Sequence, residues 1–279
     1  MAGKNPILIA EIGCSHAGSL ERAFYLSDLA CSNGADVIKF QKRNPEESVP
    51  DLLKQSPHPN PYFSYGSTYL EHRKNLELCI NDHLELKNLC EKNGKKYACS
   101  VWDFTSAREV IDICPFFIKI PSACNLNNNL IEYVLNNYVG NVHISLGMVN
   151  YQQRESILSR YGQNKNVLFY HCTSEYPCKF ENLYLKEIKY LYERFGDVGF
   201  SNHGYGIAAD IAAIALGCSC IERHFIDDRT FRHTDAAASL EPNGFKTLKR
   251  DILNVSLALS YRSFDMTETE KLQSKKMRT

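Results

Sequence analysis

Two histidines stand at matching places in one stretch of the chain, Asp197–Phe225. A short apolar run ends at His203, a helix-like segment covers Ile207–Leu216, and a second short run ends at His224. A strand, a covering helix and a next strand of this length form a βαβ unit with parallel strands, whose C-terminal ends lie side by side. The two imidazoles would then stand about 5 Å apart by backbone. A lone His is usually an ordinary core or surface residue, but such a matched pair could share a divalent metal.

The elements that must position this pair follow from the same strand-and-helix pattern, which repeats along the chain. Strand-like runs are Ile7–Ile12, Asp36–Gln41, Tyr97–Trp102, Phe116–Ile120, Val142–Leu146, Val167–Cys172, Val198–His203 and Cys220–Phe225. Helix-like stretches are Leu20–Ser32, Leu76–Asn93, Ser106–Ile113, Asn129–Asn137, Gln152–Tyr161, Leu183–Phe195 and Ile207–Leu216, with a closing helix at Asn243–Tyr261 and a tail at 262–279. Eight such units predict a closed (β/α)8 TIM barrel, an α/β fold, as a single domain over residues 1–279. A doubly wound open sheet is the alternative, but no GxGxxG motif follows the first strand.

In a (β/α)8 barrel the active site lies at the C-terminal ends of the strands. Charged and polar residues that the pattern places there are Glu11, Lys39, Gln41, Ser100, Lys119, Ser122, Ser145, Ser174, Tyr176, Ser201, His203, Glu222 and His224. Each has an ordinary explanation, since a Lys at a strand end is usually a solvated tip and a Ser there often caps the next helix. As a set gathered at one end of a barrel, they are hard to explain by packing.

The chemistry of this set can be read from its residue types. Lysines with Ser hydroxyls and nearby backbone N–H groups suit a phosphate and a carboxylate. Two neutral imidazoles suit a catalytic divalent metal that keeps open positions and polarises a carbonyl oxygen. The sequence therefore predicts a site that joins a small phosphorylated acid to an aldehyde or ketone.

Composition bounds the remaining possibilities. The 32 Lys and Arg balance 32 Asp and Glu, so no global field favours nucleic acid or an anionic membrane surface. Eleven Cys, an odd number without a CxxC pair, indicate reduced thiols and a cytoplasmic protein. No apolar run has the length of a signal peptide or a membrane span. The one long connection, Lys42–Asn75, follows the second strand at the predicted site and is expected to be a functional lid.

Eight motifs occur in order along the chain: ILIAEIGCSHAGSLERA, GADVIKFQK, FFIKIPSACN, VHISLGM, HCTSEYP, GFSNH, CIERHF and HTDAAASLEP. Together they make the chain resemble the N-acetylneuraminate (sialic acid) synthase family over nearly its whole length. The resemblance implies a (β/α)8 barrel that condenses phosphoenolpyruvate with N-acetylmannosamine or a related amino sugar. It also implies a divalent metal (Mn2+, Mg2+ or Co2+), attack of water at C2 of phosphoenolpyruvate, release of phosphate, and a nine-carbon 2-keto acid as product.

The resemblance also implies roles for individual residues of this chain. His203 and His224 match the metal ligands, while Glu11 and Glu222 match carboxylates close to the metal and the reacting carbons. The positions that match contacts to phosphoenolpyruvate are Lys39, Lys119, Ser122, Ser145, Ser174 and Ser201, with Ser100 near its carboxylate. The positions that match the acceptor site are Gln41, Tyr176 and Asp235.

Three departures from the family pattern qualify these expectations. Cys124 stands where the family has an acidic residue, a candidate for handling the proton of the attacking water. Asn202 stands where many members have Asp. The chain ends where members continue into an antifreeze-like domain that reaches across a dimer, so a homodimer and a separate chain supplying that domain are expected partners. Two alternatives stay open: a Schiff-base aldolase using Lys39 or Lys119, and a barrel that needs a partner or has lost turnover.

Overall fold

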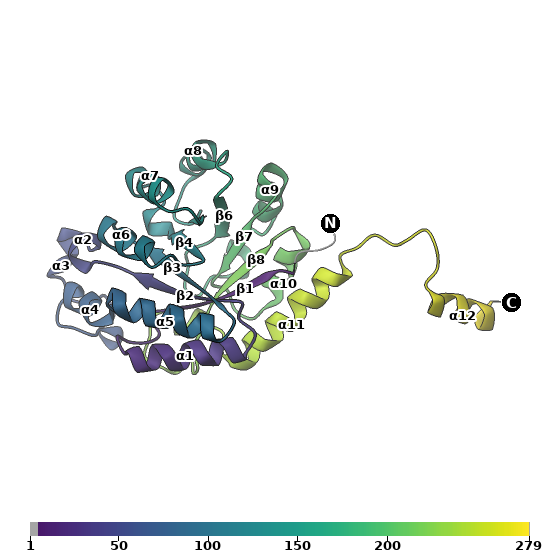
Figure 1. Ribbon diagram of the computed structural model, residues 1–279, viewed down its shortest axis with the longest axis horizontal. Coiled ribbons are helices and arrows are strands. Elements are labelled where there is room, and N and C mark those ends of the chain that lie inside the picture. The colour runs from purple at the N-terminus through teal and green to yellow at the C-terminus, as the bar shows by residue number, and fades with distance from the viewer. Residues whose placement is uncertain (1–4, 279) are drawn as a thin grey trace.

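The computed structural model describes residues 5–278 and shows eight parallel strands closed into a barrel in sequence order (Figure 1). The strands are β1 (Ile7–Gly13), β2 (Val37–Lys42), β3 (Lys96–Val101), β4 (Phe117–Ile120), β5 (Asn141–Ser145), β6 (Val167–Cys172), β7 (Gly199–Asn202) and β8 (Cys220–His224). β1 pairs with both β2 and β8, so the predicted (β/α)8 barrel is confirmed and the open sheet is wrong. Positions 1–4 and 279 of the predicted domain lie outside the described residues.

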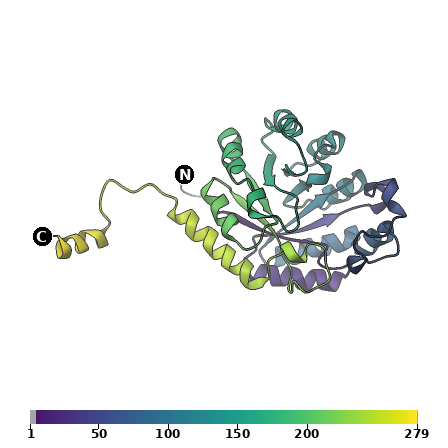
Figure 2. The same ribbon diagram turned by 180° about the vertical axis from the view of Figure 1, so that it is seen from behind.

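Helices cover the outside of this barrel (Figures 1 and 2). The helices are α1 (Leu20–Ser32), α5 (Ile80–Lys92), α6 (Phe104–Asp112), α7 (Asn128–Asn137), α8 (Tyr151–Tyr161), α9 (Lys186–Phe195), α10 (Ala208–Ala215) and α11 (Pro242–Ala258). Their apolar faces pack on the outward side chains of the strands, such as Leu8 and Ile38, to form the main hydrophobic core. None of the described helices combines the length and the apolar character that crossing a membrane requires.

The inward side chains of the strands form two successive layers. The lower layer consists of Ile9, Val37, Ala98, Phe117, Tyr170 and Cys220. Because side chains alternate along a strand, the residues two positions further on face the same interior, and they form the upper layer. The upper layer consists of Glu11, Lys39, Ser100, Lys119, Cys172 and Glu222. The barrel geometry thus places a ring of polar and charged side chains directly above an apolar layer.

The segment between β2 and β3 differs from the predicted lid and helix. The predicted helix Leu76–Asn93 begins later, as α5 at Ile80, because Glu77 has extended backbone and the side chain of Asp82 accepts a hydrogen bond from the Cys79 N–H at the start of α5. The connection before it carries α2 (Pro45–Ser48), α3 (Asp51–Lys54), a 3-10 turn (Pro61–Phe63) and α4 (Tyr69–Leu76). The connection that the sequence predicted as a lid is therefore a folded insertion.

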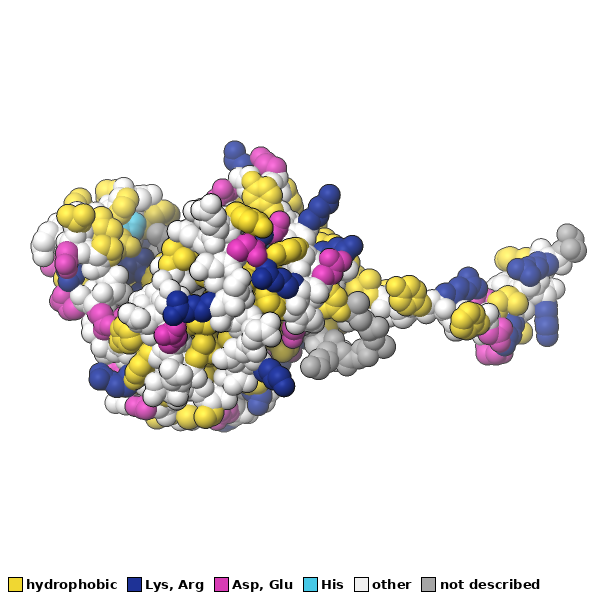
Figure 3. All heavy atoms as spheres, turned by 90° about the horizontal axis from the view of Figure 1, so that it is seen from above, with side chains coloured by type: hydrophobic (Ala, Val, Ile, Leu, Met, Phe, Trp, Pro, Cys, Tyr) yellow, Lys and Arg dark blue, Asp and Glu magenta, His cyan; other side chains and the backbone are white. Residues whose placement is uncertain are grey.

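The C-terminal part also differs from prediction. α11 ends at Ala258, earlier than the predicted closing helix, and the predicted tail contains α12 (Glu268–Met277). This last helix lies well away from the barrel (Figures 1 and 2). In Figure 3, positively and negatively charged side chains are interspersed over the visible face of the barrel and over the segment that follows α11. That distribution agrees with the balanced composition.

Candidate active site

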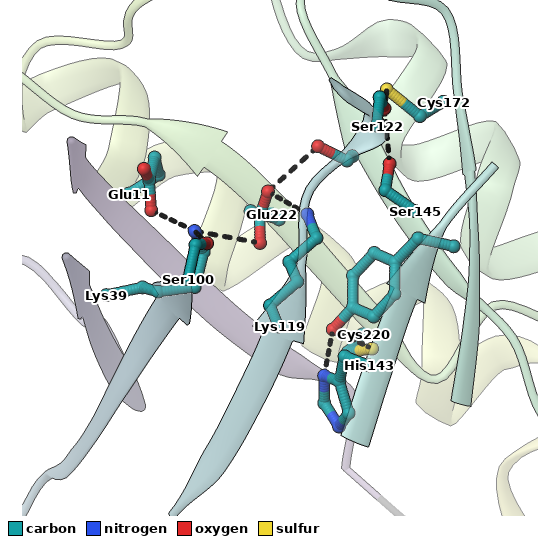
Figure 4. Close-up of polar contacts among 12 residues, drawn as sticks. Glu11, Lys39, Ser100, Lys119, Ser122, His143, Ser145, Cys172, Cys220 and Glu222 are labelled. Carbon is teal, nitrogen blue, oxygen red and sulfur yellow. Dashed lines mark hydrogen bonds and ion pairs between the residues drawn. The ribbon is translucent and has the colours of Figure 1, made fainter. Parts of the chain in front are cut away.

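Four buried charges form one network in the upper layer (Figure 4). Lys39 forms an ion pair with Glu11, and its Nζ lies 3.7 Å from Glu222 Oε2. The Nζ of Lys119 lies 2.5 Å from the other oxygen of Glu222, Oε1. Ser201 donates to that same oxygen at 2.8 Å, and Lys39 donates to Ser100 at 2.8 Å. Each charge is therefore compensated inside the protein, as a buried charge must be.

The two carboxylates have opposite proton affinities. Burial, and then the charge of Glu222, raise the pKa of Glu11, although Lys39 opposes the shift. Burial also acts on Glu222, but Lys119 and Lys39 outweigh it and hold the pKa of that carboxyl well below its ordinary value. Titratable neighbours whose pKa values are pushed apart are the usual basis of acid–base roles. Glu11 is thus the carboxyl suited to carrying a proton, and Glu222 the one that stays ionised.

A group of small polar side chains lies beside the lysines, at the ends of β4, β5 and β6. The hydroxyls of Ser122 and Ser145 are 2.8 Å apart. A Cβ on Gly147 would stand 2.5 Å from the Ser174 hydroxyl and 2.6 Å from the Ser122 hydroxyl, so glycine is required for these groups to converge. Asn125 donates to the carbonyl oxygens of Ser145 and Gly147, both at 2.8 Å, and fixes this turn. The result is a cluster of hydroxyl donors of the kind that binds phosphate oxygens.

Cys172 belongs to this group, and sequence reasoning did not select it. Its Sγ lies 3.8 Å from the Ser122 hydroxyl, 3.7 Å from the Ser174 hydroxyl and 3.9 Å from His203 Nδ1. Burial disfavours the thiolate, but His203 and Lys119 outweigh it and lower the pKa of Cys172 to about 6. The sequence signal was the alternation of side chains along β6, since Cys172 lies two residues after Tyr170 and therefore also faces the barrel interior.

The two histidines lie side by side at the ends of β7 and β8, with ring centroids 5.4 Å apart. Tyr176 packs against His203 at 4.2 Å between centroids. Burial lowers the pKa of His224 to about 3, so its imidazole is neutral, and its buried Nδ1 has no hydrogen-bond partner. His203 Nδ1 lies 3.2 Å from the Thr173 carbonyl oxygen, which leaves the other ring nitrogen available. These donors fit a metal that keeps open positions.

Among the described residues, no third protein ligand joins the histidine pair. Within residues 5–278, no group of three or more His, Cys, Asp or Glu side chains is arranged to hold a metal ion. Asp235 is the nearest acidic group on this side, with Oδ2 at 3.9 Å from His224 Nδ1. Water and substrate oxygens would therefore have to supply the other ligands of a metal at this place.

Two adjoining cavities open at this end of the barrel. The inner cavity, of about 80 Å³, is lined by Glu11, Lys39, Gln41, Ser100, Lys119, Ser122, Ser145, Tyr176, Ser201, His203, Glu222 and His224, among others. Of the other predicted residues, Ser174 lies beside it through Cys172, and Asp235 lines the outer cavity, of about 200 Å³. The structure thus brings together all of the residues that the sequence assigned to the site.

Arg43 is a second residue that sequence reasoning missed. It donates to Gln41 Oε1 at 2.7 Å, and Gln41 donates to Glu11 Oε1 at 2.6 Å, so a chain of contacts links both cavities. Its guanidinium lies over the ring of Trp102 at 3.4 Å. The signal was again the period of two, since Arg43 follows Lys39 and Gln41 along the same strand face.

The two substitutions noted in the sequence have structural explanations. The thiol of Cys124 lies 3.4 Å from the Trp102 carbonyl oxygen and does not line either cavity. Burial raises its pKa to about 11, so it is a neutral thiol. Asn202 donates to buried Asp210 at 2.7 Å and accepts from the Gly204 N–H at 2.8 Å. Asn202 thus supports the loop after β7 rather than the cavities.

Fold and site together define an enzyme of the (β/α)8-barrel class that holds small anionic molecules at its C-terminal strand ends. The chain belongs to the NeuB family, whose model matches residues 26–263.

Several known proteins are similar to it. The N,N'-diacetyllegionaminic acid synthase of Campylobacter jejuni is 31% identical over 92% of this chain and 78% of its own length. The human N-acetylneuraminate-9-phosphate synthase is 32% identical over 93% of this chain and 73% of its own length. The crystal structure of N-acetylneuraminic acid synthetase from Leptospira borgpetersenii, in complex with citrate, superposes with a TM-score of 0.82 at 26% identity, covering 98% of this chain and 92% of that one.

Proposed function

We propose that this protein condenses phosphoenolpyruvate with the aldehyde of an amino sugar to give a nine-carbon 2-keto acid and inorganic phosphate. Membership of the NeuB family and the relatives named above, together with the pseudaminic acid synthase of Campylobacter jejuni, support this class of reaction. The observation that carries the proposal is the inner cavity. There Lys39 and Lys119, with the Ser122–Ser145 hydroxyl pair, lie beside the imidazoles of His203 and His224.

The donor substrate is expected to bind in the inner cavity. Phosphoenolpyruvate carries a phosphate and a carboxylate, and two ammonium groups and several hydroxyls line this space. Charge-assisted hydrogen bonds from lysine to such oxygens are about twice as strong as neutral ones. Holding the donor in a fixed orientation beside the acceptor lowers the entropic part of the activation free energy of the condensation.

The reaction needs one bond formed between carbons and one bond broken to phosphate. C3 of the enol attacks the aldehyde carbon, and the aldehyde oxygen takes up a proton. Water adds at C2 and gives up both of its protons, one for the aldehyde oxygen and one for the departing phosphate, as the bond from C2 to the phosphate oxygen breaks and C2 becomes a ketone. Glu11, whose pKa is raised chiefly by burial, is placed to exchange these protons, while Glu222 stays ionised and holds the lysines.

The metal and the surroundings of the protein complete the proposal. His203 and His224 would hold a divalent ion (Mn2+, Mg2+ or Co2+), which supplies polarisation of a carbonyl oxygen when bound. A cytoplasmic location, a homodimer and a contact with an antifreeze-like domain are further proposals. Light scattering of the purified chain, alone and mixed with such a domain, tests the last two.

The Schiff-base alternative is less compatible with this geometry. A lysine that forms a Schiff base must first be neutral. Burial alone would favour that form, but Glu11 and Glu222 outweigh it and raise the pKa of Lys39. Lys119 is paired with Glu222 at 2.5 Å. Both lysines are therefore arranged as cations.

The decisive experiment measures phosphate release from phosphoenolpyruvate with a panel of hexosamine and diamino-sugar aldehydes, with and without Mn2+. We expect release that requires an acceptor and is lost on chelation. Trapping of a keto acid by borohydride, together with activity that survives chelator, would instead establish the aldolase. Absence of release with every acceptor, with and without an added antifreeze-like domain, would overturn the proposal.

A further inference from the structure

The outer cavity contains two arginines on neighbouring walls. Arg43 follows β2, and Arg73 belongs to α4 of the folded insertion. Both line the cavity together with Tyr65 and Trp102. The outer cavity shares Gln41, Trp102, Met148, Tyr176 and His224 with the inner cavity. A molecule whose reacting end lies at the histidine pair would therefore extend its other end toward the arginines.

Among the described residues neither arginine forms a salt bridge, although the charge of Glu77 acts on both. Across residues 5–278, no acidic oxygen lies within 4.0 Å of either guanidinium. Arg43 contacts Gln41 and the Trp102 ring, and Arg73 donates to the Tyr69 hydroxyl at 3.0 Å. Glu77, close to both in the fold, accepts instead from the backbone N–H of Arg43 at 3.0 Å.

Arg43 also has an unused donor. Its side chain is only 9% exposed, and its buried Nε has no hydrogen-bond partner among the described residues. The Trp102 Nε1, on the wall between the two cavities, is likewise buried without a partner. Buried donors left unpaired are costly. Burial, followed by the nearby charge of Arg73, lowers the pKa of Arg43, which shows that the two cations disfavour each other.

Asp235 is the acidic residue on the cavity wall, and its charge is engaged elsewhere. Its Oδ2 lies 3.9 Å from His224 Nδ1 and 4.0 Å from His233 Nε2. Asp235 is thus closest to the histidines, although the charge of Arg73 also acts on it, and the wall that carries Arg43 and Arg73 is cationic. A forked guanidinium with free N–H groups is the side chain that best matches the oxygens of a phosphate.

We infer that the acceptor sugar carries a phosphate monoester on the end remote from its aldehyde, held by Arg43 and Arg73. This inference rests on the proposed function and selects one acceptor class, because the relatives are named for both phosphorylated and unphosphorylated products. The phosphate would relieve the repulsion between the two cations. A neutral amino sugar would leave both arginines without a salt-bridge partner.

The test compares N-acetylmannosamine with N-acetylmannosamine 6-phosphate, by rate of phosphate release and by calorimetric binding without phosphoenolpyruvate. We expect kcat/KM for the phosphorylated sugar to exceed that for the neutral sugar by at least about tenfold, the size of a lost charge-assisted contact. Arg43→Gln and Arg73→Gln should each abolish that preference, and Arg43→Lys should retain part of it. Arg108→Gln, which removes an exposed arginine from α6, is the matched control and should keep the preference.

Each outcome separates the inference from the function on which it rests. Equal kcat/KM for the two sugars would overturn the inference and leave the condensation in place. Release with neither sugar would count against the proposed acceptor, and the binding measurement would then decide the site. Binding of the phosphorylated sugar that is undetectable, or unchanged in both Arg→Gln variants, would show that no phosphate site exists here. Circular dichroism of every variant verifies that the barrel is folded.

Discussion

The two layers of the barrel interior differ in chemistry although they are built from the same strands. The upper layer holds paired charges, Lys39 and Lys119 with Glu11 and Glu222. The lower layer is apolar, and its polar contacts are neutral, as between Tyr170 and His143 at 3.0 Å (Figure 4). A shift of two residues along a strand thus separates groups suited to reaction from groups that hold the barrel together.

The two layers contact each other at Lys119 and Tyr170. The Nζ of Lys119 lies 4.6 Å from the ring centroid of Tyr170, whose hydroxyl lies 3.0 Å from Cys220 Sγ in the lower layer. The aromatic face is the negative part of the ring and stabilises a cation above it. The apolar layer therefore both supports the lysine from below and keeps water away from its charge. Variants in the upper layer should change activity, and variants in the lower layer should change stability.

The largest effect is expected at the histidine pair. His203→Ala and His224→Ala should each abolish metal-dependent phosphate release while the barrel stays folded, because these side chains lie at strand ends above the packed layers. Release assays with and without chelator, with circular dichroism as the folding control, test this. Full activity of either variant in chelator would remove the metal assignment.

The next effect concerns the lysines of the upper layer. Lys39→Ala and Lys119→Ala should weaken the binding of phosphoenolpyruvate about tenfold or more, since a charge-assisted contact contributes roughly 1.5–3 kcal/mol. Calorimetric titration of each variant measures this. An affinity equal to that of the unmodified protein in both variants would place the donor elsewhere.

His143, whose ring stacks on Phe117 of the lower layer at 3.8 Å between centroids, should make the stability of the protein depend on pH. Burial lowers the pKa of His143 to about 3, so between its unfolded value near 6.5 and that value only the unfolded chain takes up a proton. The stability contributed by neutral His143 is full above about pH 6.5 and falls as the pH drops toward 3; at pH 5 the loss is about 2 kcal/mol.

Urea unfolding of the unmodified protein and of His143→Gln at pH 7.5 and pH 5 isolates this contribution. His83, also buried with a pKa lowered to about 3, adds its own loss in both proteins. The unmodified protein should therefore lose about 2 kcal/mol more than the variant. Equal losses would show that His143 does not resist protonation. Binding of phosphoenolpyruvate at pH 7.5 should be the same in both.

The smallest effect on rate is expected at Cys124. Its thiol points to the Trp102 carbonyl oxygen and lines neither cavity, so Cys124→Asp and Cys124→Glu should not accelerate phosphate release. They should cost roughly 1–3 kcal/mol of stability through a poorly solvated carboxylate. Steady-state rates, with Cys124→Ala as the uncharged control and with and without an added antifreeze-like domain, test this. An increase of about 10²–10⁴-fold would restore the acid–base role.

Much of the site could be predicted because, in a closed parallel barrel, the position of a residue along its strand determines whether its side chain faces the interior and at which end it lies. Once eight strands are recognised, residues such as Glu11 and Glu222 must share one end of the barrel. Cys172 and Arg43 obeyed the same period, but each type is more often structural or solvated, so type alone did not select them. The helices of the folded insertion were harder to predict from the sequence, because they are short and depend on caps such as Asn44 and Thr68 rather than on an extended apolar pattern.

Because the barrel closes between β1 and β8, the active site can form only after the whole barrel has folded. Glu11 in β1 is the register partner of His224 in β8, and β1 lies between β2 and β8. The site therefore assembles only when the first and last strands meet, a contact of very high sequence separation. Contacts of this kind form slowly, because the entropy of closing the intervening chain must be lost first. During refolding, recovery of substrate binding should lag behind recovery of helical signal, and a fragment lacking β8 should bind neither substrate.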